Sequence, residues 1–140
     1  NLDLLADGAG PSLFDPAWPV YTSEKLSAPA QITGYEEKDG MQYGVALNCI
    51  LARGCRINRA RVVHSVLSPN VTVNAYSTIE DSIILDNVRI GSHCAIRRAI
   101  IDKGVSIPDH TCIGHDRTAD SLKATVTDSG IVVIPKNTSF

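Results

Sequence analysis

This 140-residue sequence has few aromatic side chains and no large excess of either charge. Phe, Trp and Tyr together make up 5% of the residues, and the formal net charge is −2 at pH 7. A core with so few aromatic residues must be filled by Val, Ile, Leu and Ala, which agrees with a hydrophobic content of 44%. The weak charge gives no electrostatic basis for binding nucleic acid or an anionic membrane, so neither is expected as a partner.

The sequence also lacks a long apolar run and a paired cysteine motif. No stretch approaches the roughly 20 apolar residues that a membrane-spanning helix needs, and the first residues have neither the basic start nor the apolar stretch of a signal peptide. The four cysteines form no CxxC pair, which argues against a structural zinc site or a disulfide framework. We therefore expect a cytoplasmic location and no metal site. Since the chain does not start with Met, we also expect it to begin inside a longer protein.

The sequence divides into an arm and a regular domain. Residues 1–44 contain four of the seven prolines, and proline interrupts both helices and central strands. We predict an extended arm over 1–44, anchored by Phe14 and Trp18, that leads from a preceding domain. A single β-domain is predicted over 45–140, with a short capping strand at Ile131–Ile134.

An internal repeat occupies the middle of the chain. The equally long segments 64–80, 81–97 and 98–114 align without gaps, and a less regular coil precedes them at 47–58. Aliphatic residues recur in three columns, which are Leu67/Ile84/Ile101, Val73/Ile90/Ile107 and Ile79/Ile96/Ile113. Two positions before each column lies a second set, which is Ser65/Ser82/Ala99, Val71/Val88/Val105 and Ser77/Cys94/Thr111. The aliphatic positions are spaced 6, 6 and 5 residues apart, which is a hexapeptide pattern that is one residue short at one corner.

This pattern predicts an all-β fold, a parallel β-helix shaped as a triangular prism with about four coils of ~17 residues. Short β-branched triplets between turn residues are incompatible with a helix. The corner column Asn70, Asn87 and Gly104 has residue types that tolerate positive φ. Both sets of columns face inward because side chains alternate along a strand, and stacking supplies the core that a single coil lacks.

Two alternatives bear on this prediction. A β-sandwich also has short strands at regular intervals, but it gives no reason for a fixed repeat length in three separate columns. The usual rule for parallel crossovers predicts right-handed coiling. We expect left-handed coiling only because the hexapeptide pattern resembles the known left-handed β-helix families.

The order of several short segments resembles the C-terminal part of ADP-glucose pyrophosphorylase (glucose-1-phosphate adenylyltransferase). The opening Asn1–Leu5 resembles the end of that family's catalytic domain. Trp18–Thr22 followed by Ala28–Ala30 resembles its linker, although the linker usually has two adjacent prolines instead of Ala-Pro-Ala. Arg97–Lys103 and the closing Ser129–Lys136 resemble its last coils and C-terminal strand.

The resemblance implies a regulatory and oligomerisation module of a nucleotidyltransferase. That enzyme makes ADP-glucose and diphosphate from ATP and glucose 1-phosphate in glycogen or starch synthesis. The family's Gly-rich nucleotide loop, metal-binding Asp and sugar-phosphate contacts are absent from this sequence. We therefore predict no catalytic residue, no cofactor and no activity for this segment alone, with Mg²⁺ expected only in the catalytic domain. The implied partners are that domain, other subunits of a homo-oligomer such as a tetramer, and a phosphorylated metabolite.

Four cations near the end of the repeat are the candidate effector-binding residues, namely Lys103, Lys136, Arg97 and Arg98. Several cations around one cleft bind a phosphorylated metabolite through charge-assisted hydrogen bonds. In the family that the chain resembles, the effectors are phosphorylated sugars, phosphoglycerate, AMP or phosphate. Basic residues that match Lys103 and Lys136 are implicated there in activator binding. The alternative for each cation is a solvated corner charge, and it applies more strongly to the two arginines.

Outward-facing positions form three columns of different character. Val66, Ile83 and Ile100 form an aliphatic column, whereas the columns Thr72/Arg89/Ser106 and Thr78/Ala95/Cys112 are more polar. An exposed apolar stripe is typical of an interface. The aliphatic column is therefore predicted to contact the N-terminal arm, the catalytic domain or a second subunit.

The histidines and cysteines have plainer interpretations. His93 and His110 are one repeat apart, so they should stack at one corner below Tyr76, with His64 at another corner. A zinc site like that of γ-class carbonic anhydrases needs three imidazoles that converge on one metal, which this placement does not favour. Packing is the expected role of three inward cysteines, Cys49, Cys55 and Cys94.

Two functions from other classes remain as alternatives. One is a free-standing hexapeptide acyltransferase, which would bind acyl-CoA between coils of a trimer and need a catalytic histidine on a protruding loop. The other is a purely structural β-helix.

Overall fold

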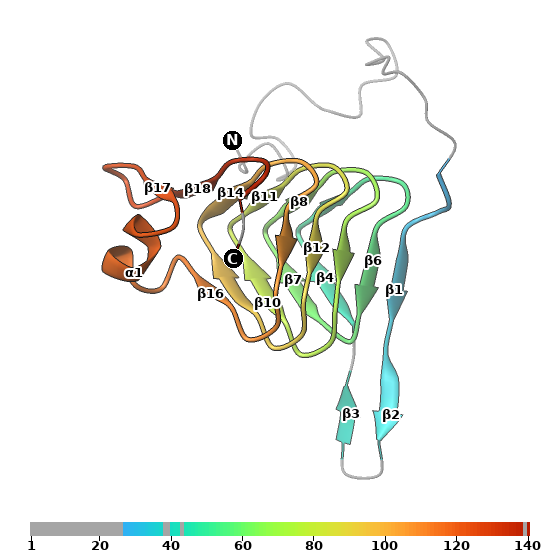
Figure 1. Ribbon diagram of the computed structural model, residues 1–140. Coiled ribbons are helices and arrows are strands. Elements are labelled where there is room, and N and C mark those ends of the chain that lie inside the picture. Colours follow the sequence, from blue (N-terminus) through green and yellow to red (C-terminus); the bar gives the residue numbers. More distant parts are fainter. Residues whose placement is uncertain (1–26, 38–39, 43, 139) are drawn as a thin grey trace.

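A computed structural model describes residues 27–37, 40–42, 44–138 and 140 of the chain. Within them the chain winds through short strands that stack into three sheets, one for each side of a triangular prism (Figure 1). The predicted anchors Phe14 and Trp18, and the rest of the arm before residue 27, lie outside the described residues.

Each side of the prism is a sheet of stacked strands. The first sheet contains β1 (Gln31–Thr33), β6 (Arg56–Asn58), β9 (Thr72–Val73), β12 (Arg89–Ile90) and β15 (Ser106–Ile107). The second contains β4 (Val45–Leu47), β7 (Arg61–Val63), β10 (Thr78–Glu80), β13 (Ala95–Arg97) and β16 (Cys112–Ile113). The third contains β5 (Ile50–Leu51), β8 (Val66–Leu67), β11 (Ile83–Ile84), β14 (Ala99–Ile101) and β18 (Val132–Ile134), with β17 (Thr125–Val126) antiparallel at its edge.

The strands pair in parallel with the same strand one coil later. In the second sheet, Ile79 lies between Val62, one coil before it, and Ile96, one coil after it. This register is the one that the gap-free repeat predicts. The predicted all-β parallel β-helix is therefore confirmed, with about four turns, and it is consistent with the left-handed hexapeptide type. A β-sandwich is excluded because its sheets are antiparallel.

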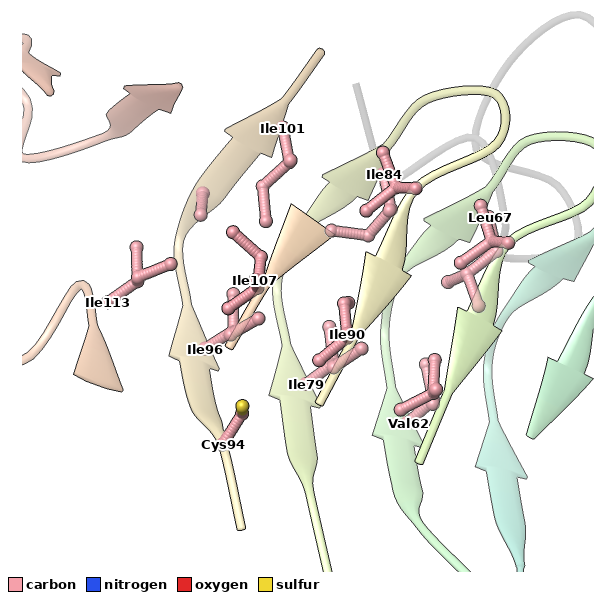
Figure 2. Packing of buried hydrophobic residues seen from close by; sticks show 14 of the residues in the cluster. Val62, Leu67, Ile79, Ile84, Ile90, Cys94, Ile96, Ile101, Ile107 and Ile113 are labelled. Carbon is pink, nitrogen blue, oxygen red and sulfur yellow. The ribbon is translucent and has the colours of Figure 1, made fainter. Parts of the chain in front are cut away.

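The three aliphatic columns form the core of the prism. All nine of their side chains are at most 3% exposed. In Figure 2, side chains such as Ile84, Ile90 and Ile96 point into the interior from three different sheets. Full burial of an aliphatic side chain of this size stabilises the fold by about 1.5–3 kcal/mol, so stacking replaces the aromatic core that the sequence lacks.

The second inward set is also buried, except for the half-buried Thr111 in the last coil. Its serine hydroxyls satisfy main-chain groups that would otherwise be unpaired. The Ser82 hydroxyl donates to the Glu80 carbonyl at 2.6 Å and accepts the Ala99 N–H at 3.1 Å. The Ser65 hydroxyl makes the equivalent pair of bonds one coil earlier. Polar atoms are thus buried inside the prism with their hydrogen bonds made.

Left-handed backbone conformations turn the chain at the corners. The predicted corner column is confirmed, with φ of 62° at Asn70, 61° at Asn87 and 70° at Gly104. The second and third corners take Tyr76/His93/His110 and His64/Asp81/Arg98, with φ between 48° and 62°. Non-glycine residues seldom adopt this conformation. Main-chain bonds between coils hold it, such as that from the His93 N–H to the Ala75 carbonyl at 3.0 Å.

Regular structure begins earlier than the predicted boundary at residue 45. Strand β1 lies within the predicted arm, yet it pairs in parallel with β6. A hairpin of β2 (Tyr35–Glu37) and β3 (Gly40–Gln42) separates β1 from β4 and projects from the prism (Figure 1). Because this hairpin lengthens the first coil, a search for the constant repeat length does not detect β1.

The polar stretch after the last full coil forms a cap. It contains the short helix α1 (Arg117–Ser121), whose N-cap Asp116 accepts the N–H groups of Thr118 and Ala119. Helix α1 and β17 lie at the end of the prism opposite the hairpin (Figure 1). The capping strand predicted at Ile131–Ile134 is observed as β18, which completes the third sheet.

Candidate functional site

The two lysines of the predicted effector site occupy equivalent positions in adjacent coils. Ile101 of β14 pairs with Ile134 of β18, so Lys103 and Lys136 follow two residues later at the same corner. Stacked strands are about 4.8 Å apart, which brings the main chains of two residues far apart in sequence close together. Both lysines are exposed.

The carboxylate of Asp102 lies between the main chains of these lysines. Its Oδ1 accepts the N–H of Lys103 at 2.7 Å, and its Oδ2 accepts the N–H of Lys136 at 3.3 Å. The hydrogen bond from the Lys103 N–H is the main reason that the pKa of Asp102 lies below its usual range, with smaller contributions from the Lys136 N–H and from both ammonium charges. The corner therefore combines two cations with one ionised carboxylate.

The two arginines lie at the other end of β14. Arg98 turns the third corner, and its guanidinium donates to the Ser129 carbonyl. Arg97 ends β13 and is exposed. Arg98 and Lys103 are five residues apart, about 16 Å along an extended strand. The structure thus brings Lys103 and Lys136 together but does not bring the arginines to them.

The aliphatic column Val66, Ile83 and Ile100 runs in register along the third sheet. It is longer than the repeat predicts, because Ile50 and Val133 extend it at either end. All five side chains are half-buried. The two end residues were missed because they lie outside the three segments that align without gaps. The corresponding column of the first sheet is more polar, as predicted, and includes the exposed residues Arg56, Arg89 and Ser106.

The predicted stack of rings at one corner is present. The ring centroids of Tyr76 and His93 are 4.8 Å apart, those of His93 and His110 are 4.9 Å apart, and both pairs are nearly parallel. The Arg59 guanidinium lies 5.8 Å from the Tyr76 ring centroid. At another corner, Nδ1 of His64 is 2.8 Å from Oδ1 of Asp81. Within the described part of the chain, no three His, Cys, Asp or Glu side chains are grouped so that they could hold a metal ion.

The inward cysteines take part in packing and weak hydrogen bonding. Burial raises the pKa of the Cys55 and Cys94 thiols, which keeps them protonated and unreactive near neutral pH. Cys55 donates to the Ser68 carbonyl at 3.2 Å and Cys94 to the Pro108 carbonyl at 3.1 Å. These contacts indicate a structural role.

A small recess lies beneath the cap at the end of the prism. It has a volume of about 70 Å³ and is lined by Cys112, Asp120, Lys123 and Phe140, among others. Asp120 is 8% exposed, and its carboxylate accepts the Gly114 N–H at 2.9 Å. A recess of this volume holds only a few water-sized molecules, so it cannot accommodate a nucleotide. No helix in the described ranges is long and apolar enough to cross a membrane.

Comparison with known proteins identifies the family of the chain. The sequence family described as "GlmU-like, C-terminal hexapeptide" matches residues 28–134. The chain belongs to this hexapeptide family. The match includes β1, which the sequence pattern had left in the arm, and ends at the last residue of β18.

Three relatives of this hexapeptide chain share a name. It is 43% identical over 136 residues to a glucose-1-phosphate adenylyltransferase from Anaeromyxobacter sp. (strain Fw109-5), and 49% identical over 136 residues to one from Anaeromyxobacter dehalogenans (strain 2CP-C). Each match covers 97% of this chain and 33% of the relative. A match to the enzyme of that name from Yersinia pseudotuberculosis serotype IB (strain PB1/+) has 34% identity over 98% of the chain and 31% of the relative. The predicted resemblance is confirmed, and the chain spans about a third of the length of these relatives.

Proposed function

We propose that this hexapeptide chain is the regulatory and oligomerisation segment of a glucose-1-phosphate adenylyltransferase. In this proposal the corner formed by Lys103 and Lys136 binds the phosphate group of a metabolite effector. Chemistry takes place elsewhere in the enzyme, in a catalytic domain that makes ADP-glucose from ATP and glucose 1-phosphate. The observation that carries the proposal is the stacking of the two lysines, far apart in sequence, at one corner of adjacent coils.

The geometry of the corner supports anion binding. Two exposed ammonium groups that start from neighbouring rungs can donate to different oxygens of one phosphate, and such charge-assisted bonds are roughly twice as strong as neutral ones. A single exposed lysine would hold a phosphate only weakly, because an ion pair in water gains little energy and must immobilise a long side chain. Arg98 is already bonded to the Ser129 carbonyl, so we assign it to the fold, and Arg97 stays a weaker candidate at a distant corner.

The aliphatic column supports the second half of the proposal. Five half-buried aliphatic side chains in register form a continuous stripe along the third sheet. A stripe of this kind is suited to pack against another apolar surface. We propose that it contacts the catalytic domain or another subunit of a homo-oligomer.

Activator titration of the full-length enzyme that carries this segment tests the effector site. Lys103→Ala and Lys136→Ala should each raise the half-saturating concentration of a phosphorylated effector at least about tenfold, since each removes one charge-assisted contact of about 1.5–3 kcal/mol. Activity without effector should change little, because neither lysine belongs to the catalytic domain. The measurement is ADP-glucose formation at increasing concentrations of sugar phosphate, phosphoglycerate, AMP or phosphate.

Arg53→Ala is the matched control for this titration. Arg53 is exposed and lies at the same corner, three coils before Lys103 and about 14 Å from it. It should leave activation unchanged. If activation in both lysine variants equals that of the wild type, the effector site is not at this corner.

A further inference from the structure

The carboxylate of Asp102 connects the two lysines of the corner, and the proposed function assigns it no role. Its bond to the Lys103 N–H is local and joins neighbouring residues. Its bond to the Lys136 N–H links residues 34 apart in sequence and crosses from one coil to the next. One side chain therefore contacts the main chain on both rungs of the proposed site.

The turn after β18 is joined to the preceding coil by this contact and by a main-chain bond from the Asp102 N–H to the Ile134 carbonyl at 2.9 Å. At the same corner of the earlier coils, main-chain bonds run from rung to rung, for example from the Asn87 N–H to the Pro69 carbonyl and from the Gly104 N–H to the Asp86 carbonyl. The turn that carries Lys136 is the last one of the described chain at this corner. The Asp102 carboxylate attaches it to the coil before it.

We infer that Asp102 is a positioning residue of the anion site, which clamps the main chains of Lys103 and Lys136 side by side so that both ammonium groups reach one phosphate. This inference rests on the proposed function of the two lysines. The opposite effect is inhibition of binding, in which the Asp102 carboxylate competes with the incoming anion for the two ammonium groups. The clamp is favoured because both carboxylate oxygens of the half-buried Asp102 already accept main-chain N–H groups, and loss of this alignment removes one of the two direct contacts to the anion.

The first test needs no ligand and uses the 140-residue chain. In a pH titration followed by NMR, the amide protons of Lys103 and Lys136 should shift together. Their common midpoint should lie below the usual range of an aspartate, since the bond from the Lys103 N–H favours the ionised form. Asp102→Ala should abolish both titrations. Asp86→Ala is the matched control, because Asp86 lies at the same corner one coil earlier, and it should preserve both.

The second test measures sulfate binding by calorimetry as the pH is lowered. Sulfate itself takes up a proton at the acid end of the range in which Asp102 titrates, so the wild-type profile is compared with that of Asp102→Ala, in which no carboxylate remains at this position. In the wild type, sulfate affinity should fall about tenfold as Asp102 becomes protonated and releases the Lys136 turn. Asp102→Ala should bind sulfate weakly at every pH, while Asp86→Ala should follow the wild type. Circular dichroism checks that each variant is folded, and Asp102→Asn takes the place of Asp102→Ala if the alanine variant does not fold.

The outcomes separate the inference from the proposed function. If wild-type affinity for sulfate rises on acidification, or if Asp102→Ala binds sulfate more tightly, Asp102 competes with the anion and the clamp is overturned. A Lys136 amide that does not titrate with Asp102 also overturns it. If the amides titrate together but the wild type binds no sulfate at neutral pH, the proposed anion site fails, and the inference fails with it even though the clamp exists as a contact.

Discussion

At the scale of single residues, the buried serines show how a parallel β-helix accepts polar groups in its core. Ser82 lies two positions before the aliphatic Ile84 and is 1% exposed. Its hydroxyl donates a hydrogen bond to the Glu80 carbonyl and accepts one from the Ala99 N–H in the next coil. A small residue is required at this position because the chain turns into the next sheet there. A hydroxyl is favoured because it satisfies the Ala99 N–H.

Ser82→Ala tests this reading. The substitution leaves the buried Ala99 N–H without its acceptor, so the free energy of unfolding should fall by about 1–3 kcal/mol. Urea denaturation followed by circular dichroism measures the change. Ser106→Ala, on the exposed face of the first sheet, should alter stability by less than about 0.5 kcal/mol. Equal stability of the Ser82 variant and the wild type would show that the hydroxyl is replaceable, for instance by water.

The sequence predicted the corners only in part, for a physical reason. Asn70, Asn87 and Gly104 are residue types that adopt positive φ readily, so their column could be recognised. Asp81 and Arg98 adopt φ of 48° and 49°, but Arg in particular has no intrinsic preference for this region. At that corner the conformation is imposed by strand pairing on both sides, which residue type alone does not reveal.

The repeat also did not predict that Lys103 and Lys136 occupy equivalent positions in adjacent coils. Ile101 and Ile134 are paired across adjacent coils, but the polar insertion between them makes their separation longer than one repeat. Only the resemblance to a known family singled out Lys103 and Lys136. The contribution of Asp102 was missed because a bond between rungs can be predicted only when the register of β18 is known.

At the scale of elements, the cap shows how one end of the core is closed. Asp120 is the buried residue of α1, and its carboxylate accepts the Gly114 N–H at the end of the last coil. Ala124 and Val126, which follow the helix, pack against the core cluster. The helix itself is too short to be stable in isolation, so its attachment through Asp120 keeps this segment in place.

Asp120→Ala should therefore loosen the cap without unfolding the prism. Amide hydrogen exchange should become at least tenfold faster over residues 114–126, while the amides of β10 and β11 should exchange as in the wild type, because local opening does not require the core to open. Mass spectrometry of proteolytic fragments gives this comparison. The exposed Asp128 provides the control through Asp128→Ala. Faster exchange throughout the chain would contradict a local role and would indicate that the cap supports the whole fold.

Strands could be predicted from the repeat only where paired strands are a constant number of residues apart. In the three coils without insertions, the predicted aliphatic columns fall on the observed strands, because each strand lies one constant repeat from its neighbour. β1 was missed because the hairpin separates it from β4, and α1 because a helix of five residues has no apolar period to detect. Where the spacing between paired strands changes, periodicity carries no information.

At the scale of the whole molecule, the column from Ile50 to Val133 gives the third sheet an outward face unlike that of the first. The first sheet exposes Arg56 and Arg89, whereas the third presents aliphatic residues on five consecutive rungs. Rungs about 4.8 Å apart give a stripe about 19 Å long. Such a length is suited to a continuous packing contact rather than to a single anchoring side chain.

Ile83→Lys is expected to weaken this contact in the full-length enzyme. A charged group in the middle of an apolar stripe must be desolvated when the contact forms, which costs several kcal/mol if it is unpaired. Subunit association should weaken at least tenfold if the stripe lies between subunits. Sedimentation velocity over a concentration series measures the change.

Ser106→Lys places the same side chain on the first sheet and should leave association unchanged. If Ile83→Lys assembles as the wild type does but loses stability, the stripe packs against the catalytic domain of its own chain. If both association and stability are unchanged, the stripe is not an interface.

The hairpin has a broader consequence for how this architecture acquires new parts. The β2–β3 hairpin enters where the first sheet passes into the second, and α1 enters where the second passes into the third. In both cases the stacked strands keep their partners, so the inserted segment does not shift the register of the strands on either side of it. The remaining edge, which runs through Gly54, Asn70, Asn87, Gly104 and Asn137, carries no graft in the described coils. It is also the edge on which Lys103 and Lys136 lie, and the two grafted edges are the natural places for an engineer to attach a new loop without disturbing it.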